Sequence, residues 1–283
     1  MKPKQKVWMI TGASRGFGLE IAQAALEAGD QVVAAVRSKP EELAHKLQDN
    51  KNLLVTVLDV TDERQAEDAV KQAVDRFGAI DVLVNNAGYG LLAAVEEASA
   101  EEVNRIFETN VFGLLHVTRA VLPQMRKQRS GHVINISSVG GLTGIAGWGL
   151  YGSTKFAVEG LTEAMASELS PLGIHATAVE PGFFRTEFLD TSSLSRSSHQ
   201  IEDYAGTVGE MRSYATQVNK KQPGDPRKLA KALIQLAGSE NPPVHLPLGK
   251  DTLDLYRAKT AAFERDIEAW FDVIAGTDHD DVG

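Results

Sequence analysis

The stretch Thr11-Gly-Ala-Ser-Arg-Gly-Phe-Gly18 decides the fold of this chain, because it joins two different apolar patterns. Before it, Val7–Thr11 is a short apolar run that stops at glycine, which is typical of a buried strand. After it, Arg15–Ala28 carries an apolar stripe at helical spacing. Glycines permit a tight turn and close approach of backbone to a pyrophosphate, and the start of the next helix offers free N–H groups. We therefore predict a phosphate-binding turn; the Gly-Lys-Ser/Thr ending of a nucleoside triphosphatase loop does not occur in it.

Strand and helix patterns alternate through the next part of the chain. The strand patterns are nearly continuous apolar runs, and the helix patterns repeat every three or four residues. The predicted strands are Gln31–Arg37, Leu53–Asp59, Asp81–Asn85, His132–Ser137 and His175–Glu180, and the predicted helices are Asp62–Phe77, Ser99–Lys127 and Tyr151–Leu169. Such alternation indicates a parallel sheet covered by helices on both faces. We therefore predict an α/β fold, a doubly wound parallel sheet of the Rossmann type, as a single domain over residues 1–283.

The pattern changes after Pro181. Residues 190–200 are polar and rich in serine, and apolar residues then recur at helical steps to about residue 219. We interpret residues 187–220 as a lid that closes over a substrate, with a permanently docked helix as the alternative. Helical patterns return at Arg227–Ala237 and Thr252–Ile274, so residues 250–276 are predicted to form a C-terminal helical extension.

Composition excludes several classes of function. The net charge of −9 argues against a nucleic-acid surface, which needs a basic patch. The chain has no cysteine, so it has no disulfide and no thiolate metal site, and its seven histidines show no ligand spacing. We therefore predict no metal site. No apolar run approaches the roughly 18 residues of a membrane span, and the first run is too short for a signal peptide, so we expect a cytoplasmic protein.

Five further motifs follow the glycine turn, at the ends of predicted strands or on predicted helices. They are Asn85-Asn-Ala-Gly88, Asn110, Ser138, Tyr151-Gly-Ser-Thr-Lys155 and Pro181-Gly-Phe-Phe-Arg-Thr186. In this order, and with T-G-x-x-x-G-x-G spacing in the turn, they resemble the short-chain dehydrogenase/reductase family over residues 6–186. That range is the predicted cofactor-binding and catalytic core. The ending of the chain resembles the branch related to 17-beta-hydroxysteroid and retinol dehydrogenases.

The resemblance implies hydride transfer between a nicotinamide cofactor and a ketone, aldehyde or secondary alcohol, with Asn110, Ser138, Tyr151 and Lys155 as the catalytic residues. Tyr151 and Lys155 are four residues apart, so they point to one face of one helix. A cation there is expected to lower the pKa of Tyr151, the acid/base, from about 10. By the resemblance, Lys155 also holds the nicotinamide ribose, Ser138 stabilises the substrate oxygen and Asn110 holds a water. Two alternatives stay open: Ser137 in place of Ser138, and a helix-kinking Asn110 without a catalytic role.

The cofactor is predicted to be NADP. NAD-specific members of the family carry an acidic residue at the end of the second strand, where this chain has Val36 followed by Arg37. Arg37 can bind a 2′-phosphate, and Arg15 is a second cation within the turn. By the resemblance, Asp59 and Val60 contact the adenine side. The full predicted set is Gly12, Ser14, Arg15, Gly16, Phe17, Gly18, Arg37, Asp59, Val60, Asn86, Ala87, Gly88, Tyr151, Lys155, Pro181, Gly182, Phe184 and Thr186.

The substrate side is predicted to be apolar and to include Gly140, Trp148, Phe183 and Phe188, with packing in the core or lid as the alternative for the aromatic residues. We expect a small-molecule carbonyl or alcohol as the substrate and a homodimer formed through the two long helices. A non-enzymatic NADP-sensing regulator is the alternative function, although the intact catalytic set argues against it. A sugar-nucleotide epimerase or dehydratase usually has T-G-x-x-G-x-x-G spacing, which differs from the turn of this chain.

Overall fold

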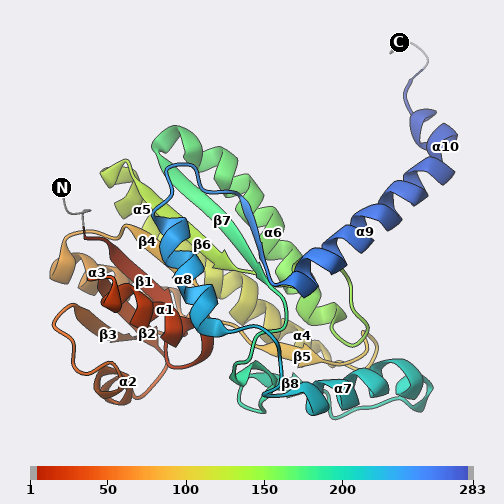
Figure 1. Ribbon diagram of the computed structural model, residues 1–283, viewed down its shortest axis with the longest axis horizontal. Coiled ribbons are helices and arrows are strands. Elements are labelled where there is room, and N and C mark those ends of the chain that lie inside the picture. Colours follow the sequence, from red (N-terminus) through yellow and green to blue (C-terminus); the bar gives the residue numbers. More distant parts are fainter. Residues whose placement is uncertain (1–4, 280–283) are drawn as a thin grey trace.

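A parallel sheet of seven strands lies at the centre of the computed structural model, which describes residues 5–279 (Figure 1). The strand order is β3-β2-β1-β4-β6-β7-β9. The strands are β1 Val7–Thr11, β2 Gln31–Val36, β3 Leu53–Val57, β4 Val82–Asn85, β6 Gly131–Ile136, β7 Ile174–Pro181 and β9 His245–Leu248. The order reverses between β1 and β4, which is where doubly wound sheets open a crevice for ligands. The predicted fold is confirmed. The seventh strand, β9, escaped prediction because it is four residues long, contains a proline and forms a sheet edge.

Helices cover both faces of the sheet. Helices α1 Gly16–Glu27, α2 Pro40–Lys46 and α8 Pro226–Ala237 lie on one face, and α3 Glu63–Phe77, α5 Gly113–Gln128 and α6 Gly149–Leu169 lie on the other. The position of β1 between two layers of helices explains its apolar sequence. Trp8 and Ile10 join the core under α1 and α8, while Val7 and Met9 join the core under α3 and α5. Alternate side chains of a strand point to opposite faces, so a doubly covered strand needs apolar residues at every position.

The long helix predicted over Ser99–Lys127 is interrupted. Ser99 begins it with a capping box, in which Ser99 Oγ accepts from the Glu102 N–H at 3.2 Å and the Ser99 N–H donates to Glu102 Oε2 at 2.9 Å. Helix α4 Ala100–Phe107 then passes into one π-helical turn, η1 Glu108–Phe112, before α5 begins. A π-helical turn holds Asn110, and such turns occur often at functional sites. Periodicity does not reveal one extra residue in a continuing helix.

The segment 187–220 is built from short elements. They are η4 Glu187–Leu189, β8 Leu194–Arg196, η5 Glu202–Tyr204, η6 Ala205–Gly209 and α7 Glu210–Val218. Strand β8 pairs in parallel with β5 Gly90–Leu92, outside the main sheet. Buried Glu97 anchors the segment: its carbonyl accepts from Ser197 Oγ at 2.8 Å, and its carboxylate accepts from the Ile201 N–H at 3.0 Å and pairs with Arg212. These contacts favour the docked alternative, and the movement of a lid stays a prediction.

The C-terminal extension leaves the body of the protein. Figure 1 shows α9 Lys250–Ala269 projecting from the sheet, followed by α10 Phe271–Ala275 after a break at Trp270. The one buried residue of α9 is Thr252, near its start. Its aromatic residues Tyr256 and Phe263 are exposed. Two short turns complete the described elements, η2 Val139–Gly141 and η3 Ser170–Leu172. Within residues 5–279, no helix is long and apolar enough to cross a membrane.

Candidate active site

The predicted catalytic residues meet at the carboxyl end of the sheet. Ser138 follows β6 directly and begins η2, where its Oγ accepts from the Gly140 N–H at 3.1 Å. Tyr151 and Lys155 stand one turn apart on α6, and both side chains are buried. Lys155 Nζ lies 5.7 Å from the centre of the Tyr151 ring and donates to the Ile136 carbonyl at 2.8 Å. A Cβ on Gly140 would lie 3.6 Å from both Ser138 Oγ and Tyr151 Cε1, so the Ser138 hydroxyl is next to the Tyr151 ring. Ser137 is buried and its Oγ makes no hydrogen bond, so the structure brings Ser138 to Tyr151 and leaves Ser137 apart.

Burial dominates the protonation of this site. Burial raises the pKa of Tyr151 to about 12, although the Ser138 hydroxyl acts in the opposite direction. Burial also lowers the pKa of Lys155 to about 8, against the charge of Glu159, which raises it. The pKa of Tyr151 therefore moves opposite to the sequence-based expectation. The reason is that desolvation of a fully buried phenol is the largest influence on its pKa and outweighs the opposing effect of Ser138. At neutral pH the tyrosine holds its proton and can donate it.

Asn110 is tied to its surroundings by its side-chain amide. Its Oδ1 accepts from the Tyr89 N–H at 3.1 Å, and its Nδ2 donates to the Tyr89 carbonyl at 2.9 Å and to Thr154 Oγ1 at 3.2 Å. These bonds hold the π-helical turn against the backbone of Tyr89, and Oδ1 keeps a second lone pair. Sequence reasoning missed Thr154, which joins this turn to the catalytic helix. The sequence feature that could have identified Thr154 is its position within the Tyr-x-x-x-Lys motif.

The glycine turn has the shape of a cradle. Gly12 and Gly16 have φ values of +64° and +54°, which side chains rarely adopt. Gly18 packs so closely that a Cβ atom there would stand 2.5 Å from the Gly12 carbonyl oxygen and 2.6 Å from Asn86 Nδ2. Asn86 supports the turn by donating to the carbonyls of Thr11 and Gly12 at 2.9 and 3.1 Å. No side chain caps α1, because Arg15 stands at its N-cap, so first-turn N–H groups are left for a ligand.

The other predicted cofactor residues divide into two groups. Thr186 lies beside the turn, since a Cβ on Gly16 would stand 3.7 Å from Thr186 Cβ, and Gly88 lies near Lys155 and Asn110. Arg37 is exposed immediately after β2, and Ser14 is exposed in the turn. The side chains of the second group already contact other parts of the protein. Phe184 packs edge-on against Phe17 at 5.4 Å, and Val60 packs against Gly113. Asp59 Oδ1 accepts a hydrogen bond from Thr61, and Arg15 donates to the Ser192 carbonyl at 2.7 Å.

A model of the short chain dehydrogenases matches residues 6–196, which is more than half of the chain. The chain belongs to the short-chain dehydrogenase family. It is 41% identical over 250 residues to a 3-ketodihydrosphingosine reductase of Bacteroides thetaiotaomicron, covering 88% of this chain and 89% of that protein. The crystal structure of a short-chain dehydrogenase from Streptomyces avermitilis is 40% identical, with a TM-score of 0.90 over 98% of this chain and 100% of that chain. ElxO with NADP bound is 31% identical, with a TM-score of 0.74 over 89% of this chain and 100% of that one.

Aromatic side chains pack around Tyr151. Trp148 stacks on Phe188 with ring centres 6.1 Å apart, and Phe188 lies 5.5 Å from Tyr151. Gly140 is next to the Tyr151 ring, because a Cβ there would lie 3.6 Å from Tyr151 Cε1. Gly90, which sequence reasoning missed, lies beneath Phe188 and Trp148, and a Cβ there would meet both at about 3.0–3.1 Å. Three of the four predicted substrate residues therefore lie together next to Tyr151.

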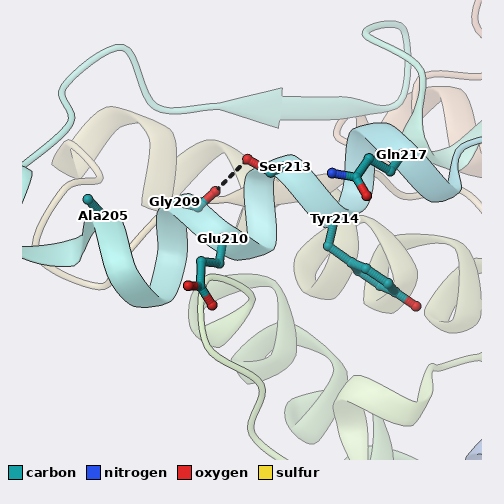
Figure 2. Close-up of a pocket in the computed structure, with 6 residues that line it drawn as sticks. All are labelled: Ala205, Gly209, Glu210, Ser213, Tyr214 and Gln217. Carbon is teal, nitrogen blue, oxygen red and sulfur yellow. Dashed lines mark hydrogen bonds between the residues drawn. The ribbon is translucent and has the colours of Figure 1, made fainter.

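Phe183, the fourth predicted substrate residue, lies elsewhere in the dehydrogenase. Its ring meets Tyr214 of α7 edge-on at 6.5 Å, and its N–H donates to Asp251 Oδ2 at 2.6 Å. Tyr214 also lines an open hollow on α7 (Figure 2). Figure 2 shows Glu210 and Tyr214 on one side of this helix and Ser213 and Gln217 on the other. Phe183 is therefore associated with α7 and the start of α9, away from the rings that cover Tyr151.

Proposed function

We propose that this dehydrogenase is an NADP-dependent carbonyl reductase or alcohol dehydrogenase, with Tyr151 as the acid/base. One observation carries the proposal: the buried Tyr151 side chain lies next to the Ser138 hydroxyl, and Lys155 stands one helical turn away. A ketone that becomes an alcohol needs a proton at its oxygen, and Tyr151 holds that proton at neutral pH. The other hydroxyl, Ser138, can donate to the same oxygen and stabilise the charge that develops there.

The glycine turn fits a dinucleotide. A side chain on Gly18 would fill the cradle, and the uncapped start of α1 directs N–H groups toward a pyrophosphate. Thr186 and Lys155 would hold the nicotinamide end, and bound NADPH supplies the hydride. Lys155 holds a positive charge below pH 8, which suits it for binding ribose hydroxyls and for returning a proton to Tyr151. The main chain at Asn110 would hold the water that passes this proton onward.

The choice of NADP over NAD rests on charge. Arg37 is exposed at the end of β2, where a carboxylate would otherwise bind a ribose 2′-hydroxyl. Arg15 stands at the N-cap of the neighbouring helix. An arginine binds phosphate through two parallel hydrogen bonds, which a 2′-hydroxyl cannot match. The bound NADP of ElxO supports the same choice.

The substrate side suits an apolar carbonyl compound. Trp148 and Phe188 form the wall next to Tyr151, and Phe188 belongs to the segment 187–220. Because Phe188 packs against Tyr151, we infer that this segment is a lid that moves when a substrate carbonyl binds there. A relative that shares 41% identity is a ketone reductase by name, which supports reduction as the direction of the reaction.

A homodimer through the outer face of α5 and α6 is part of the proposal. Phe112, at the end of η1, and Phe156, on α6, are 45% and 46% exposed. Two large apolar side chains on neighbouring helices are the kind of surface that a second copy of the chain would cover. Light scattering on the purified protein, compared with a Phe156→Glu variant, tests this. A monomer at micromolar concentration rejects the dimer.

The experiment that tests the function follows NADPH absorbance over a panel of ketones and aldehydes. Tyr151→Phe keeps the ring and removes the hydroxyl, so turnover is expected to fall by about 10²–10⁴-fold while NADPH affinity stays the same. Tyr256→Phe removes an exposed hydroxyl from α9 and is the matched control. Turnover that survives in Tyr151→Phe overturns the assigned role. NADPH binding by the unaltered protein without any turnover on the panel favours the NADP-sensing regulator instead.

A further inference from the structure

Three titratable side chains meet behind the catalytic residues. Glu159 comes from α6, Glu180 from the end of β7 and His245 from the start of β9. His245 Nδ1 lies 3.0 Å from Glu180 Oε1 and 3.3 Å from Glu159 Oε2. One potential ligand atom from each residue lies within 4.8 Å of the other two. The cluster is separate from the proposed chemistry, because none of its members is a predicted catalytic or cofactor residue.

The two buried carboxylates share one partner of opposite charge, His245. Glu180 is fully buried and Glu159 is 6% exposed. Neither oxygen of Glu159 accepts a hydrogen bond, and Glu180 Oε2 accepts none. A buried carboxylate is stable only when it is paired, hydrogen-bonded or bound to a metal. His245 contributes at most one positive charge against these two carboxylates, and burial raises the pKa of both, that of Glu180 to about 7. The cluster therefore needs either a shared proton or a bound cation in place of a second positive charge.

Ser137 is an independent sign of a ligand at this place. Its side chain is 3% exposed and its Oγ makes no hydrogen bond. The hydroxyl faces Glu159: a Cβ on Gly141 would stand 2.7 Å from Ser137 Oγ and 3.0 Å from Glu159 Oε1, so both oxygens border one small space. Buried hydroxyls in folded proteins have hydrogen-bond partners almost without exception. Ser137, which lies just after β6, thus adds a fourth potential ligand atom next to Glu159.

The orientation of His245 is the one that a metal ligand adopts. Its outer nitrogen, Nε2, lies 3.5 Å from Glu163 Oε1, and its inner nitrogen faces the two buried carboxylates. Histidines that bind metals usually donate their second ring N–H to a carboxylate, which fixes the ring and leaves the other nitrogen for the metal. Glu163 would serve as this orienting group.

We propose that Glu159, Glu180 and His245 bind one divalent cation of the zinc class, with Ser137 Oγ as a fourth ligand. A set of one imidazole and two carboxylates suits zinc, whereas Mg²⁺ and Ca²⁺ take oxygen ligands. The cation would join α6, β7 and the edge strand β9. Its role would be to hold the end of the sheet that carries Ser138 and Pro181, and it takes no part in hydride transfer. The sequence-based prediction of no metal site rested on spacing, and these ligands stand 21 and 65 residues apart along the chain.

The test uses the full-length protein stripped with EDTA and titrated with Zn²⁺ by calorimetry, with metal content measured after dialysis. One zinc per chain is expected, with a rise in Tm of about 5 °C at saturating metal. Glu180→Gln and His245→Gln should each weaken Zn²⁺ binding by at least about tenfold. His45→Gln is the matched control, because His45 is an exposed histidine paired with Asp49.

Three results overturn the proposal. The first is the absence of stoichiometric zinc in the unaltered protein, which leaves a proton shared between the carboxylates. The second is equal zinc binding by the control and by both site variants, which assigns the metal to the surface. The third is Mg²⁺ binding as tight as that of Zn²⁺, which rejects the proposed class of cation. Anomalous diffraction from zinc-soaked crystals of the unaltered protein locates the metal independently, in case a variant does not fold.

Discussion

The catalytic face and the segment 187–220 lie against each other, but they are held in different ways. Ser138, Tyr151 and Lys155 stand on β6 and α6, whose apolar residues enter the cores on the two faces of the sheet. The segment is made of short turns, one three-residue strand and one short helix. It is attached by the pairing of β8 with β5, by a small apolar cluster that includes Phe188 and Leu194, and by polar contacts with buried Glu97.

This difference shows how stability is distributed around the site. A residue on a packed sheet is held by many apolar contacts, and the loss of any one of them is shared by the others. A segment held by one short strand pair, a small apolar cluster and one buried ion pair has fewer such contacts, and such regions open more readily than cores. The arrangement places the catalytic groups on rigid elements and the covering aromatic ring, Phe188, on an element that can move.

The largest effect is expected from removing the anchor of the segment. Glu97→Ala leaves Arg212 without its partner in a nearly buried position, and breaking a buried ion pair costs about 3–5 kcal/mol. Hydrogen exchange should then become fast in residues 187–220 and stay slow in β1, β4 and β6. Glu101→Ala, which removes an exposed pair with Arg105, is the control and should change stability by at most about 0.5 kcal/mol.

The same exchange measurement examines the lid in the unaltered protein. Amides of residues 187–220 are expected to gain protection when NADPH and a ketone are both bound. Strong protection of the segment without ligands, unchanged by either one, would leave the docked helix as the correct interpretation.

A second comparison adds one methyl group to each region. Gly18→Ala should clash with the Gly12 carbonyl and Asn86, destabilise the fold by about 1–3 kcal/mol and weaken NADPH binding. Gly206→Ala in the segment meets nothing within 4 Å and should leave both properties unchanged. Thermal unfolding and fluorescence titration with NADPH measure the two effects. Equal behaviour of the two variants contradicts the close packing assigned to the turn.

A smaller effect is expected for the choice of cofactor. Arg37→Glu replaces a cation that can bind a 2′-phosphate with an anion that repels it. The affinity for NADPH should fall by about tenfold or more, while the affinity for NADH changes little. Arg227→Glu, on the exposed start of α8, keeps the change in net charge and is the control. If Arg37→Glu changes both cofactors alike, Arg37 does not select the phosphate.

The last prediction concerns the dependence of stability on pH. Burial lowers the pKa of Lys155 to about 8 from its usual 10.5, so between these values the unfolded chain binds a proton that the folded protein releases. Stability due to this group therefore rises with pH from about 8 to about 10. The raised pKa of Tyr151 acts in the opposite direction, above pH 10. Urea unfolding at pH 8, 9 and 10 should show the unaltered protein gaining stability relative to Lys155→Met, and parallel curves contradict this.

Local patterns were sufficient to predict most of the fold. The apolar runs of β1 and β2 and the stripe of α1 require burial on both faces, so they predict the doubly covered sheet. The capping box at Ser99 was correct because it needs only residues three positions apart. The π-helical turn at Asn110 and the edge strand β9 were missed, since one extra residue in a helix and a four-residue strand with a proline leave no periodic signal.

The sequence by itself determined the glycine turn and the placing of Tyr151 and Lys155 on one helix face, because these depend on backbone preference and on spacing within a few residues. Only the tertiary structure decided which aromatic rings cover Tyr151, that Phe183 lies apart from them, and that burial raises the pKa of the tyrosine. It also brought together Glu159, Glu180 and His245, which no spacing rule connects. The physical reason is that desolvation and contacts between distant residues depend on how elements pack against one another, and local periodicity carries no information about that packing.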